Sequence, residues 1–128
     1  MNIFIHSIQD LLHAEHLSNS FKHAIIFITT KPNYYSFGYT PFLKLDIPDV
    51  ENPNISIYIK DCLEDFLDRV KDIDILYVCC DAGLSRSPAV AMFAAEHYGN
   101  EKQSMDIETN HRFINMSLYH EFKKDANK

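Results

Sequence analysis

The chain has 128 residues, of which 46% are hydrophobic, and it carries a formal net charge of −6. This length and apolar content suit one compact domain, so we expect a single domain spanning residues 1–128. The acidic balance argues against binding to nucleic acid or to an anionic membrane surface, because both need clustered lysine and arginine. The longest apolar stretch, residues 89–95, is far shorter than the roughly 20 residues of a membrane-spanning helix. Residues 1–10 lack the features of a signal peptide.

The three cysteines form a poor framework for disulfides, because their number is odd and Cys79 and Cys80 are adjacent. Disulfides are also rare in compartments where thiols are kept reduced. We therefore expect free thiols, a cytoplasmic protein and no contact with a membrane.

The first half of the chain alternates between apolar runs, which are typical of buried strands, and more polar connections. Residues 2–6, 24–29 and 42–47 are rich in β-branched and aromatic side chains, and we expect a strand in each. After the first of them, Ser7 followed by Asp10 resembles a helix start. The short helix expected there carries apolar side chains at Leu11, Leu12 and Leu17.

The second half predicts further helices around one more strand. Over residues 55–71, apolar side chains recur every three or four positions, which is typical of an amphipathic helix. Residues 75–78 are β-branched and aromatic and predict a strand. Residues 87–98 are apolar nearly all round, so we expect a buried helix with Gly99 just past its end. A last helix is expected over residues 111–124.

Strands separated by helical segments indicate an α/β fold: one domain with a mainly parallel central sheet and helices on both faces. Sites in such sheets lie at the carboxyl ends of the strands. Three segments are therefore expected at one edge of the sheet, namely residues 31–41, 46–49 and 80–86.

The segment from Cys80 to Arg86 is the most informative one, because it lies between a predicted buried strand and a predicted helix. Pro88 suits the first turn of that helix, where its missing N–H costs nothing. The backbone N–H groups of such a turn converge at the positive end of the helix and bind anions. The turn would stabilise an ionised thiol at Cys80, and the planar guanidinium of Arg86 can bind two phosphate oxygens. We therefore expect a phosphate or sulfate ion to bind here.

Residues 80–87 read Cys-Asp-Ala-Gly-Leu-Ser-Arg-Ser. This run resembles the signature loop of the cysteine-dependent protein tyrosine phosphatases, in particular the small dual-specificity type. The resemblance to small bacterial and phage-type members runs the whole length of the chain and is weak outside the loop. The resemblance implies a phosphatase-type three-layer sandwich and a metal-independent hydrolase without a cofactor. It would cleave phosphomonoesters, most readily phosphotyrosine or other aryl phosphates, on phosphorylated proteins or small molecules, through a phosphocysteine intermediate.

Each residue of the loop has an expected part in that chemistry. Cys80 is the nucleophile, since a thiolate attacks phosphorus well, and Arg86 balances the charge that develops on the phosphoryl oxygens. Gly83 permits a backbone conformation that turns its N–H inward. By resemblance, Ser87 donates a hydrogen bond to the departing thiolate, although it could equally be a plain helix cap. The residues expected to surround the phosphoryl group are Asp81, Ala82, Gly83, Leu84, Ser85 and Arg86.

A leaving alkoxide or phenoxide needs a proton, so a carboxylic acid is expected at the same edge of the sheet. Asp46 and Asp49 are both available. Asp49 matches the acid loop of the family better, because alternation along the third strand would place Asp46 within that strand. We favour Asp49, while both remain open as ordinary turn residues.

Cys79, directly before the loop, departs from the family, and Asp81 within the loop bears on its chemistry. Cys79 stands where the family usually has a histidine that helps to keep the thiolate ionised, which puts the efficiency of Cys80 in question. Asp81 adds a carboxylate beside the nucleophile, and like-charge repulsion is expected to raise the pKa of the thiol and to disfavour polyanionic substrates.

Two other functions stay open. A module that binds phosphorylated partners without turnover is favoured if Cys79 impairs activation. A sulfur- or arsenate-handling reductase would use a similar loop but needs resolving cysteines, and only Cys62 remains. The aromatic residues of 31–41 either line the pocket or pack on the surface. His13 and His16 share a helix face, but two ligands do not make a metal site, and none is expected.

Overall fold

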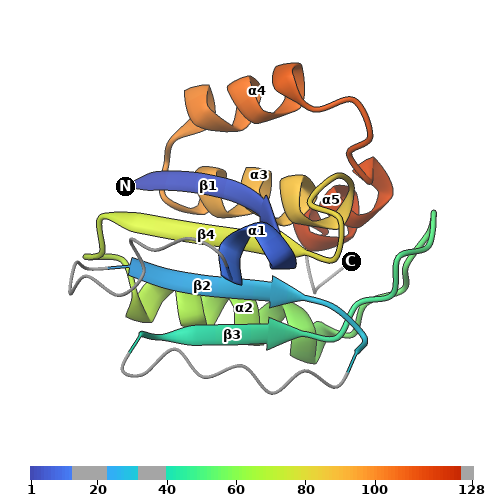
Figure 1. The fold of residues 1–128 in the computed structure, drawn as a ribbon, viewed down its shortest axis with the longest axis horizontal. Helices are drawn as coiled ribbons and strands as arrows, with labels where there is room; N and C mark the ends of the chain where they lie inside the picture. The colour runs from blue at the N-terminus through green and yellow to red at the C-terminus, as the bar shows by residue number, and fades with distance from the viewer. Residues whose placement is uncertain (13–22, 32–39, 125–128) are drawn as a thin grey trace.

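The computed structural model describes residues 1–12, 23–31 and 40–124, which form a parallel sheet flanked by helices (Figure 1). The strands are β1 (Asn2–Ser7), β2 (His23–Ile28), β3 (Phe42–Leu45) and β4 (Ile75–Cys80). The helices are α1 (Ile8–Leu12), α2 (Ile57–Arg69), α3 (Arg86–His97), α4 (Glu101–Asn110) and α5 (Met116–Lys123). The predicted α/β class with a mainly parallel sheet is confirmed.

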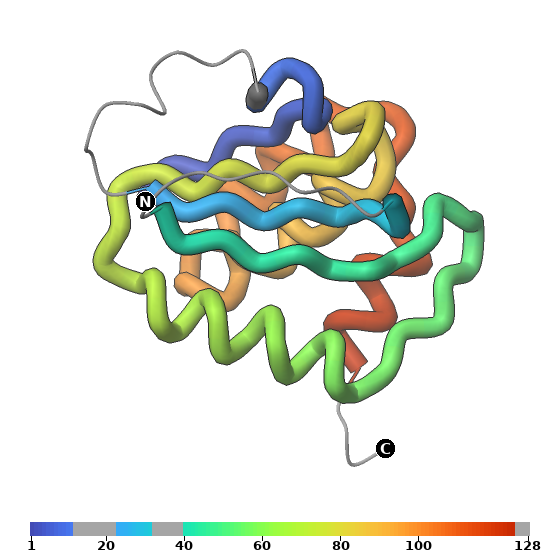
Figure 2. Tube along the Cα trace, turned by 60° about the horizontal axis from the view of Figure 1, so that its bottom comes forward, coloured from blue at the N-terminus to red at the C-terminus, as the bar shows by residue number. Residues whose placement is uncertain are grey.

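The strands lie in the order β1-β4-β2-β3, and every neighbouring pair is parallel. All four strands therefore end at the same edge of the sheet. In Figure 2 the chain leaves β3 at that edge, passes through residues 46–56 and returns along the sheet as α2. The turn after β4 and the segment after β3 consequently start from the same edge.

Alternation along the strands divides the core between the two faces of the sheet. One face packs against α2, α3, α4 and α5 and includes Ile26 of β2 and Val78 and Cys80 of β4. The other face packs against α1 and includes Phe27 of β2 and Cys79 of β4. Helices thus cover both faces, as predicted, and the adjacent cysteines point to opposite sides of the sheet.

The element boundaries differ from the predicted ones in ways that matter for the site. Strand β4 runs two residues beyond the predicted end and finishes at Cys80, because Cys79 and Cys80 pair with β1 and β2. Strand β3 ends at Leu45, so the expectation that Asp46 belongs to the strand is wrong. Helix α3 begins at Arg86.

The prediction of a single last helix over residues 111–124 is also wrong, because α4 precedes it and α5 starts only at Met116. Helix α4 was missed because only Ser104 and Ile107 of it are buried, which leaves little apolar periodicity. A signal was present in Asn100 followed by Gln103, since the Asn100 side chain accepts a hydrogen bond from the Gln103 N–H at 3.1 Å.

Several predicted features lie outside the described residues: the extension of the first helix to Leu17, the pair His13 and His16, and most of the aromatic segment 31–41. None of the helices that the structure describes is both long and apolar enough to span a membrane.

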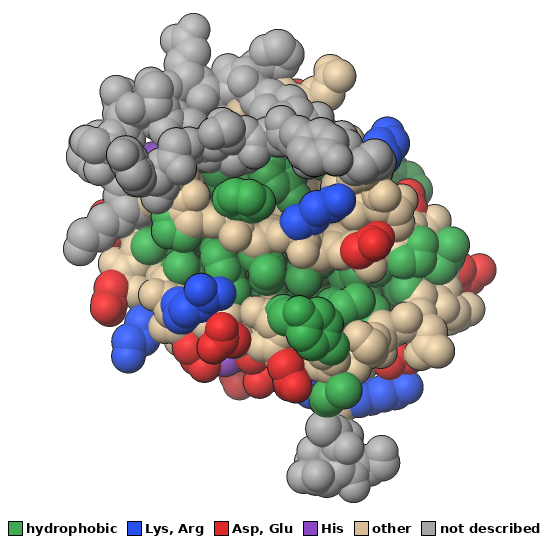
Figure 3. Space-filling view, turned by 90° about the horizontal axis from the view of Figure 1, so that it is seen from below, with side chains coloured by type: hydrophobic (Ala, Val, Ile, Leu, Met, Phe, Trp, Pro, Cys, Tyr) green, Lys and Arg blue, Asp and Glu red, His purple; other side chains and the backbone are tan. Residues whose placement is uncertain are grey.

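Strand β3 is the outermost strand on one side of the sheet and lies beside α2. Figure 3 shows hydrophobic side chains gathered over this face, with acidic side chains along one margin. The exposed large side chains of these two elements are Phe42, Ile57 and Tyr58. Strand β3 has only four residues, and so short an edge offers few backbone groups for pairing with another chain.

Candidate active site

The predicted loop is a five-residue turn between the last residue of β4, Cys80, and the first residue of α3, Arg86. Gly83 in this turn has a φ of 71°, the left-handed conformation that glycine adopts without strain. A Cβ atom at this position would lie 2.6 Å from the Ser7 nitrogen and 2.7 Å from the His6 carbonyl carbon. Glycine is therefore required twice, for its conformation and for the close approach of the turn to the end of β1.

The sulfur of Cys80 lies within hydrogen-bonding reach of this turn. The Gly83 N–H donates to Sγ at 3.2 Å, and the Ser87 hydroxyl lies 3.2 Å from Sγ. Burial raises the pKa of the Cys80 thiol, but hydrogen bonds from the Ser87 hydroxyl and from the backbone N–H groups of Ser87, Gly83 and Ser85 outweigh it and lower that pKa overall. The turn therefore stabilises a thiolate at Cys80.

Cys79 is in the opposite state. Its side chain is fully buried on the α1 face of the sheet, away from the turn. Burial, with the neighbouring Cys80 as a second cause, raises the pKa of Cys79 to about 12, and a hydrogen bond from the His6 backbone offsets this only in part. Cys79 is therefore a neutral thiol at physiological pH, so one of the two adjacent cysteines is primed for ionisation and the other is not.

Arg86 holds its charge inside the protein, with only 3% of its side chain exposed. Its Nη1 donates to the Ile47 carbonyl at 2.9 Å, and its Nη2 donates to Asp81 Oδ2 at 3.1 Å. Its Nε is buried and has no hydrogen-bond partner within residues 1–12, 23–31 and 40–124. Buried donors are nearly always paired in proteins, so an unpaired N–H on a buried guanidinium indicates a place for an external acceptor.

The two candidate acids are placed differently. Asp49 lies beside the guanidinium, with its Oδ1 3.8 Å from Arg86 Nε and 62% of its side chain exposed. This distance is too long for a hydrogen bond, and the carboxylate remains open to solvent and to any group that enters the turn. Asp46 is exposed directly after β3. The structure thus brings Asp49 next to the predicted site, and its role as the acid stays a prediction.

Asp81 contacts other groups than those expected from the sequence. Its Oδ1 accepts a hydrogen bond from the Thr29 hydroxyl at 3.0 Å, and its Oδ2 accepts the bond from Arg86. Lys31 Nζ lies 4.0 Å from Oδ1. The pKa of Cys80 is lowered overall by the hydrogen bonds at its sulfur, so the expected rise through Asp81 does not decide it. The physical reason is that the carboxylate is held by Arg86 and Thr29 while N–H groups and the Ser87 hydroxyl surround the sulfur.

Ser87 is not the cap of α3. The helix begins at Arg86 with Ser85 at the N-cap position, and the Ser85 side chain makes no capping bond. Ser87 lies fully buried inside the first turn, with its hydroxyl next to the Cys80 sulfur. The hydroxyl therefore lies beside the sulfur, and its expected hydrogen bond to the departing thiolate stays a prediction.

Sequence reasoning missed two residues that tie the site together. Thr29, just past β2, holds Asp81, and no local pattern announces a contact across the sheet edge. Asn115 links the two site segments: its backbone N–H donates to the Ser85 carbonyl at 3.0 Å and its side chain donates to the Val50 carbonyl at 2.8 Å. The only sign of Asn115 in the sequence was its place as the N-cap of α5, where its Oδ1 accepts a hydrogen bond from the Leu118 N–H.

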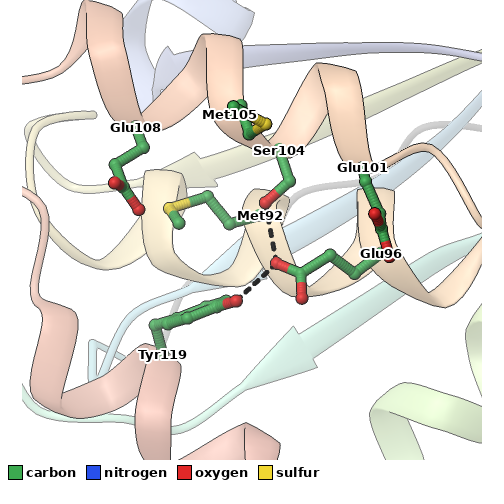
Figure 4. Close-up of a pocket in the computed structure, with 7 residues that line it drawn as sticks. All are labelled: Met92, Glu96, Glu101, Ser104, Met105, Glu108 and Tyr119. Carbon is green, nitrogen blue, oxygen red and sulfur yellow. Dashed lines mark hydrogen bonds between the residues drawn. The ribbon is translucent and has the colours of Figure 1, made fainter.

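A separate pocket of about 220 Å³ lies between α3, α4 and α5 and contains none of the predicted site residues (Figure 4). Glu96 in this pocket accepts hydrogen bonds from Ser104 at 2.7 Å, from Tyr119 at 2.5 Å and from Lys123 at 2.5 Å. The pocket is lined by Met92, Glu96, Glu101, Ser104, Met105, Glu108 and Tyr119. Glu96 is thus fully engaged in joining three helices.

Comparisons with known proteins identify the fold. The chain resembles PTPMT1 with a TM-score of 0.65 and 15% identity over 95% of this chain and 87% of that one. The tyrosine phosphatase OH1 from the Orf virus gives 0.62 and 18% over 95% and 79%. The human tyrosine phosphatase-like serine/threonine/tyrosine-interacting protein gives 0.59 and 21% over 95% and 89%.

The chain has the dual-specificity phosphatase fold. No protein-family model matches the sequence, and no curated protein matches it either. At identities of 15 to 21%, the structural likeness extends to the fold alone. The dual-specificity phosphatase fold nevertheless confirms the architecture that the run at residues 80–87 led us to expect.

Proposed function

We propose that the protein is a metal-independent phosphatase that hydrolyses phosphomonoesters through a phosphocysteine at Cys80. One observation carries this proposal. A thiol with a lowered pKa lies in the same turn as a buried guanidinium whose Nε has no hydrogen-bond partner. A nucleophile in its ionised form and an unfilled donor for an oxyanion are the two parts that phosphoryl transfer to sulfur needs. The dual-specificity phosphatase fold supports the same conclusion.

In the first step, the Cys80 thiolate attacks phosphorus in line with the leaving oxygen. Arg86 and the backbone N–H groups of residues 81–86 bind the other phosphoryl oxygens. As the P–O bond breaks, Asp49 in its protonated form transfers its proton to the leaving oxygen. The products are an alcohol or phenol, a carboxylate at Asp49 and a phosphocysteine at Cys80.

In the second step, the Asp49 carboxylate takes a proton from a water molecule, which attacks the phosphocysteine. The S–P bond breaks and orthophosphate leaves, which restores the thiolate and the protonated acid. The Ser87 hydroxyl, 3.2 Å from the sulfur, donates a hydrogen bond to the thiolate as it departs. Only 2% of Cys80 is exposed, so only a group that enters the turn itself reaches the sulfur.

Aryl phosphates, and phosphotyrosine first among them, are the proposed substrates, on phosphorylated proteins or as small molecules. A phenoxide is the easier leaving group, so it places the least demand on an acid that is largely exposed. The likeness to the Orf virus protein, described as a tyrosine phosphatase with triple substrate specificity, supports this substrate class. We place the activity in the cytoplasm, because the free thiols of Cys62, Cys79 and Cys80 suit a reducing compartment.

The test is turnover of a chromogenic aryl phosphate by the parent and by Cys80→Ser. The parent should release phosphate, while Cys80→Ser should bind orthophosphate and release none, because a hydroxyl is far less ionised than this thiol. Alkylation by a small electrophile should follow a pH midpoint below about 8.5, the ordinary thiol value, and should occur at Cys80 and not at Cys79. Turnover that persists in Cys80→Ser would exclude the mechanism.

The second candidate is a module that binds phosphorylated partners without hydrolysis. Cys79 in the place of the family's histidine favours it, and so does the likeness to the human protein described as tyrosine phosphatase-like and interacting. This candidate predicts that the parent binds an aryl phosphate and leaves it intact. The turnover assay therefore separates the two functions directly.

A further inference from the structure

Asp81 is bound at both of its carboxylate oxygens, although it lies in the loop that we propose binds phosphate. Oδ2 accepts a hydrogen bond from Arg86 Nη2 at 3.1 Å, and Oδ1 accepts one from the Thr29 hydroxyl at 3.0 Å. The side chain is 30% exposed, so it lies at the mouth of the turn rather than in the core. A negative group of the protein therefore already sits on the guanidinium that the substrate has to bind.

The contact with Asp81 engages one of the Arg86 nitrogens that a phosphoryl group would bind. Nη1 is taken by the Ile47 carbonyl, a neutral backbone group in a buried position. One N–H of Nη2 donates to Asp81, and Nε has no hydrogen-bond partner among the described residues, with Asp49 3.8 Å away. A guanidinium binds a phosphoryl group strongly through two N–H groups at once. The two-point contact that uses Nε pairs it with Nη2, and one of the two N–H groups of Nη2 already donates to Asp81.

The negative charges around the turn also disfavour the binding of a phosphate dianion. Arg86 faces the carboxylates of Asp81 and Asp49 at 3.1 and 3.8 Å, and a third negative charge arises when Cys80 ionises. An incoming phosphoryl dianion is repelled by each of these groups at short range, where water screens least. Asp81 is the one of the three that has no step in the proposed reaction.

We propose that Asp81 is a specificity-determining competitor for Arg86: its carboxylate occupies Nη2 in the free protein and must yield when a phosphoryl group binds. This inference rests on the proposed function, since it concerns the same anion site. It predicts weak affinity for phosphate dianions and a preference for phosphoryl groups carried on uncharged bodies such as an aromatic ring. Substrates with further anionic groups near the phosphate are disfavoured.

The surroundings provide a second position for the displaced carboxylate. Lys31 Nζ lies 4.0 Å from Asp81 Oδ1, and the Lys31 backbone N–H donates to the Thr29 hydroxyl oxygen at 3.2 Å. Asp81 can therefore leave Arg86, keep its bond from Thr29 and move toward the Lys31 ammonium. Lys31 is 67% exposed, so this alternative pair is a weak one and does not hold Asp81 permanently.

The test is the affinity for orthophosphate, measured by calorimetry at fixed pH and ionic strength, of the parent and of Asp81→Asn. Asparagine keeps the shape and an acceptor for Thr29 but removes the charge. We expect binding about tenfold tighter, the scale of one charge contact at a partly exposed position. The matched control is Asp65→Asn on α2, which makes the same change of charge at an exposed residue paired with Arg69 and should leave the affinity unchanged.

Lys31→Gln tests the second position independently. It should weaken phosphate binding about two- to threefold in the parent and have no effect in the Asp81→Asn background, because it acts only through Asp81. An effect of Lys31→Gln that persists in that background would show that Lys31 attracts phosphate directly, which would overturn its role as the receiver of Asp81. Asp81→Ala repeats the main test should Asp81→Asn fold poorly.

The outcomes separate the two proposals. If the parent hydrolyses aryl phosphates and Asp81→Asn binds orthophosphate no better or more weakly, Asp81 supports Arg86 instead of competing for it, and only the competition is overturned. If neither protein binds orthophosphate or turns over an aryl phosphate, the proposed function fails and the competition fails with it. Tighter binding by Asp81→Asn, with the control unchanged, supports the competition, and turnover of the aryl phosphate by the parent supports the proposed function.

Discussion

Helix α3 carries an ionisable side chain, largely removed from solvent, near each of its ends, and the two are treated in opposite ways. Arg86 at the N-terminal end is 3% exposed, and its Nε donates no hydrogen bond to any residue that the structure describes. Glu96 near the C-terminal end is 18% exposed and accepts hydrogen bonds from Ser104, Tyr119 and Lys123. The positive charge at the N-terminus and the negative charge near the C-terminus both oppose the helix dipole, which favours anions at the N-terminus and cations at the C-terminus. Contacts with other parts of the fold must therefore stabilise each charge.

The reasons differ. The partners of Glu96 come from α4 and α5, so its network joins three helices and leaves its carboxylate saturated. Arg86 donates hydrogen bonds to a backbone carbonyl and to Asp81, the group that we propose a phosphoryl group displaces. Its guanidinium can still bind another acceptor. A saturated buried charge stabilises a fold, whereas an incompletely paired one is a cost that a ligand can relieve. The contrast predicts that substitutions at one end of α3 change activity and those at the other change stability.

Arg86→Lys should give the largest effect, a loss of about 100- to 1000-fold in kcat/KM for an aryl phosphate. A lysine keeps the charge but not the planar pair of donors, so it cannot bind two oxygens at fixed geometry. Steady-state kinetics provide the measurement. Arg69→Lys on the exposed face of α2 is the matched control and should leave kcat/KM unchanged. Activity close to that of the parent in Arg86→Lys would show that the guanidinium is structural.

Asp49→Asn should slow substrates with poor leaving groups by roughly 100-fold and activated aryl phosphates much less, because only a poor leaving group depends on the proton. Asp46→Asn, a few residues earlier in the same segment, is the control and should have little effect. A larger loss in Asp46→Asn than in Asp49→Asn would move the role of the acid to Asp46.

Glu96→Gln should leave kcat/KM unchanged and lower the free energy of unfolding by about 1 to 2 kcal/mol, because charge-assisted bonds to three partners are weakened. Denaturant unfolding at neutral pH measures this. Glu101→Gln at the exposed rim of the same pocket is the control and should change stability by less than about 0.5 kcal/mol.

The effect of Glu96 should also depend on pH in a fixed direction. Burial raises the pKa of this carboxyl, but hydrogen bonds from Lys123, Tyr119 and Ser104 outweigh it and lower the pKa overall. The stability that the ionised carboxylate contributes is therefore fully present above the unfolded value of about 4.3 and is lost as the pH falls through the lower folded value. The difference between parent and Glu96→Gln should shrink in acid, and a constant difference would contradict the assignment.

The sequence alone determined the architecture and the position of the turn between Cys80 and Arg86. Four apolar runs predicted four strands, and each contains a strand in the structure because buried parallel strands need continuous apolar side chains. Residues 75–78 predicted a strand, residues 87–98 predicted a helix and the run at residues 80–87 predicted the turn between them, since each of these patterns is a local property of the chain. Helix α4 escaped prediction because it buries only two side chains and so shows little apolar periodicity.

Only the tertiary structure decided which groups meet around that turn. Cys79 and Cys80 are alike in the sequence, but alternation of β4 between two packed faces raises the pKa of one and places the other among hydrogen-bond donors. The bond from Thr29 to Asp81 and the link through Asn115 join residues far apart in the chain. Such contacts depend on how the ends of the strands come together in the folded sheet, so no local pattern of residues could announce them.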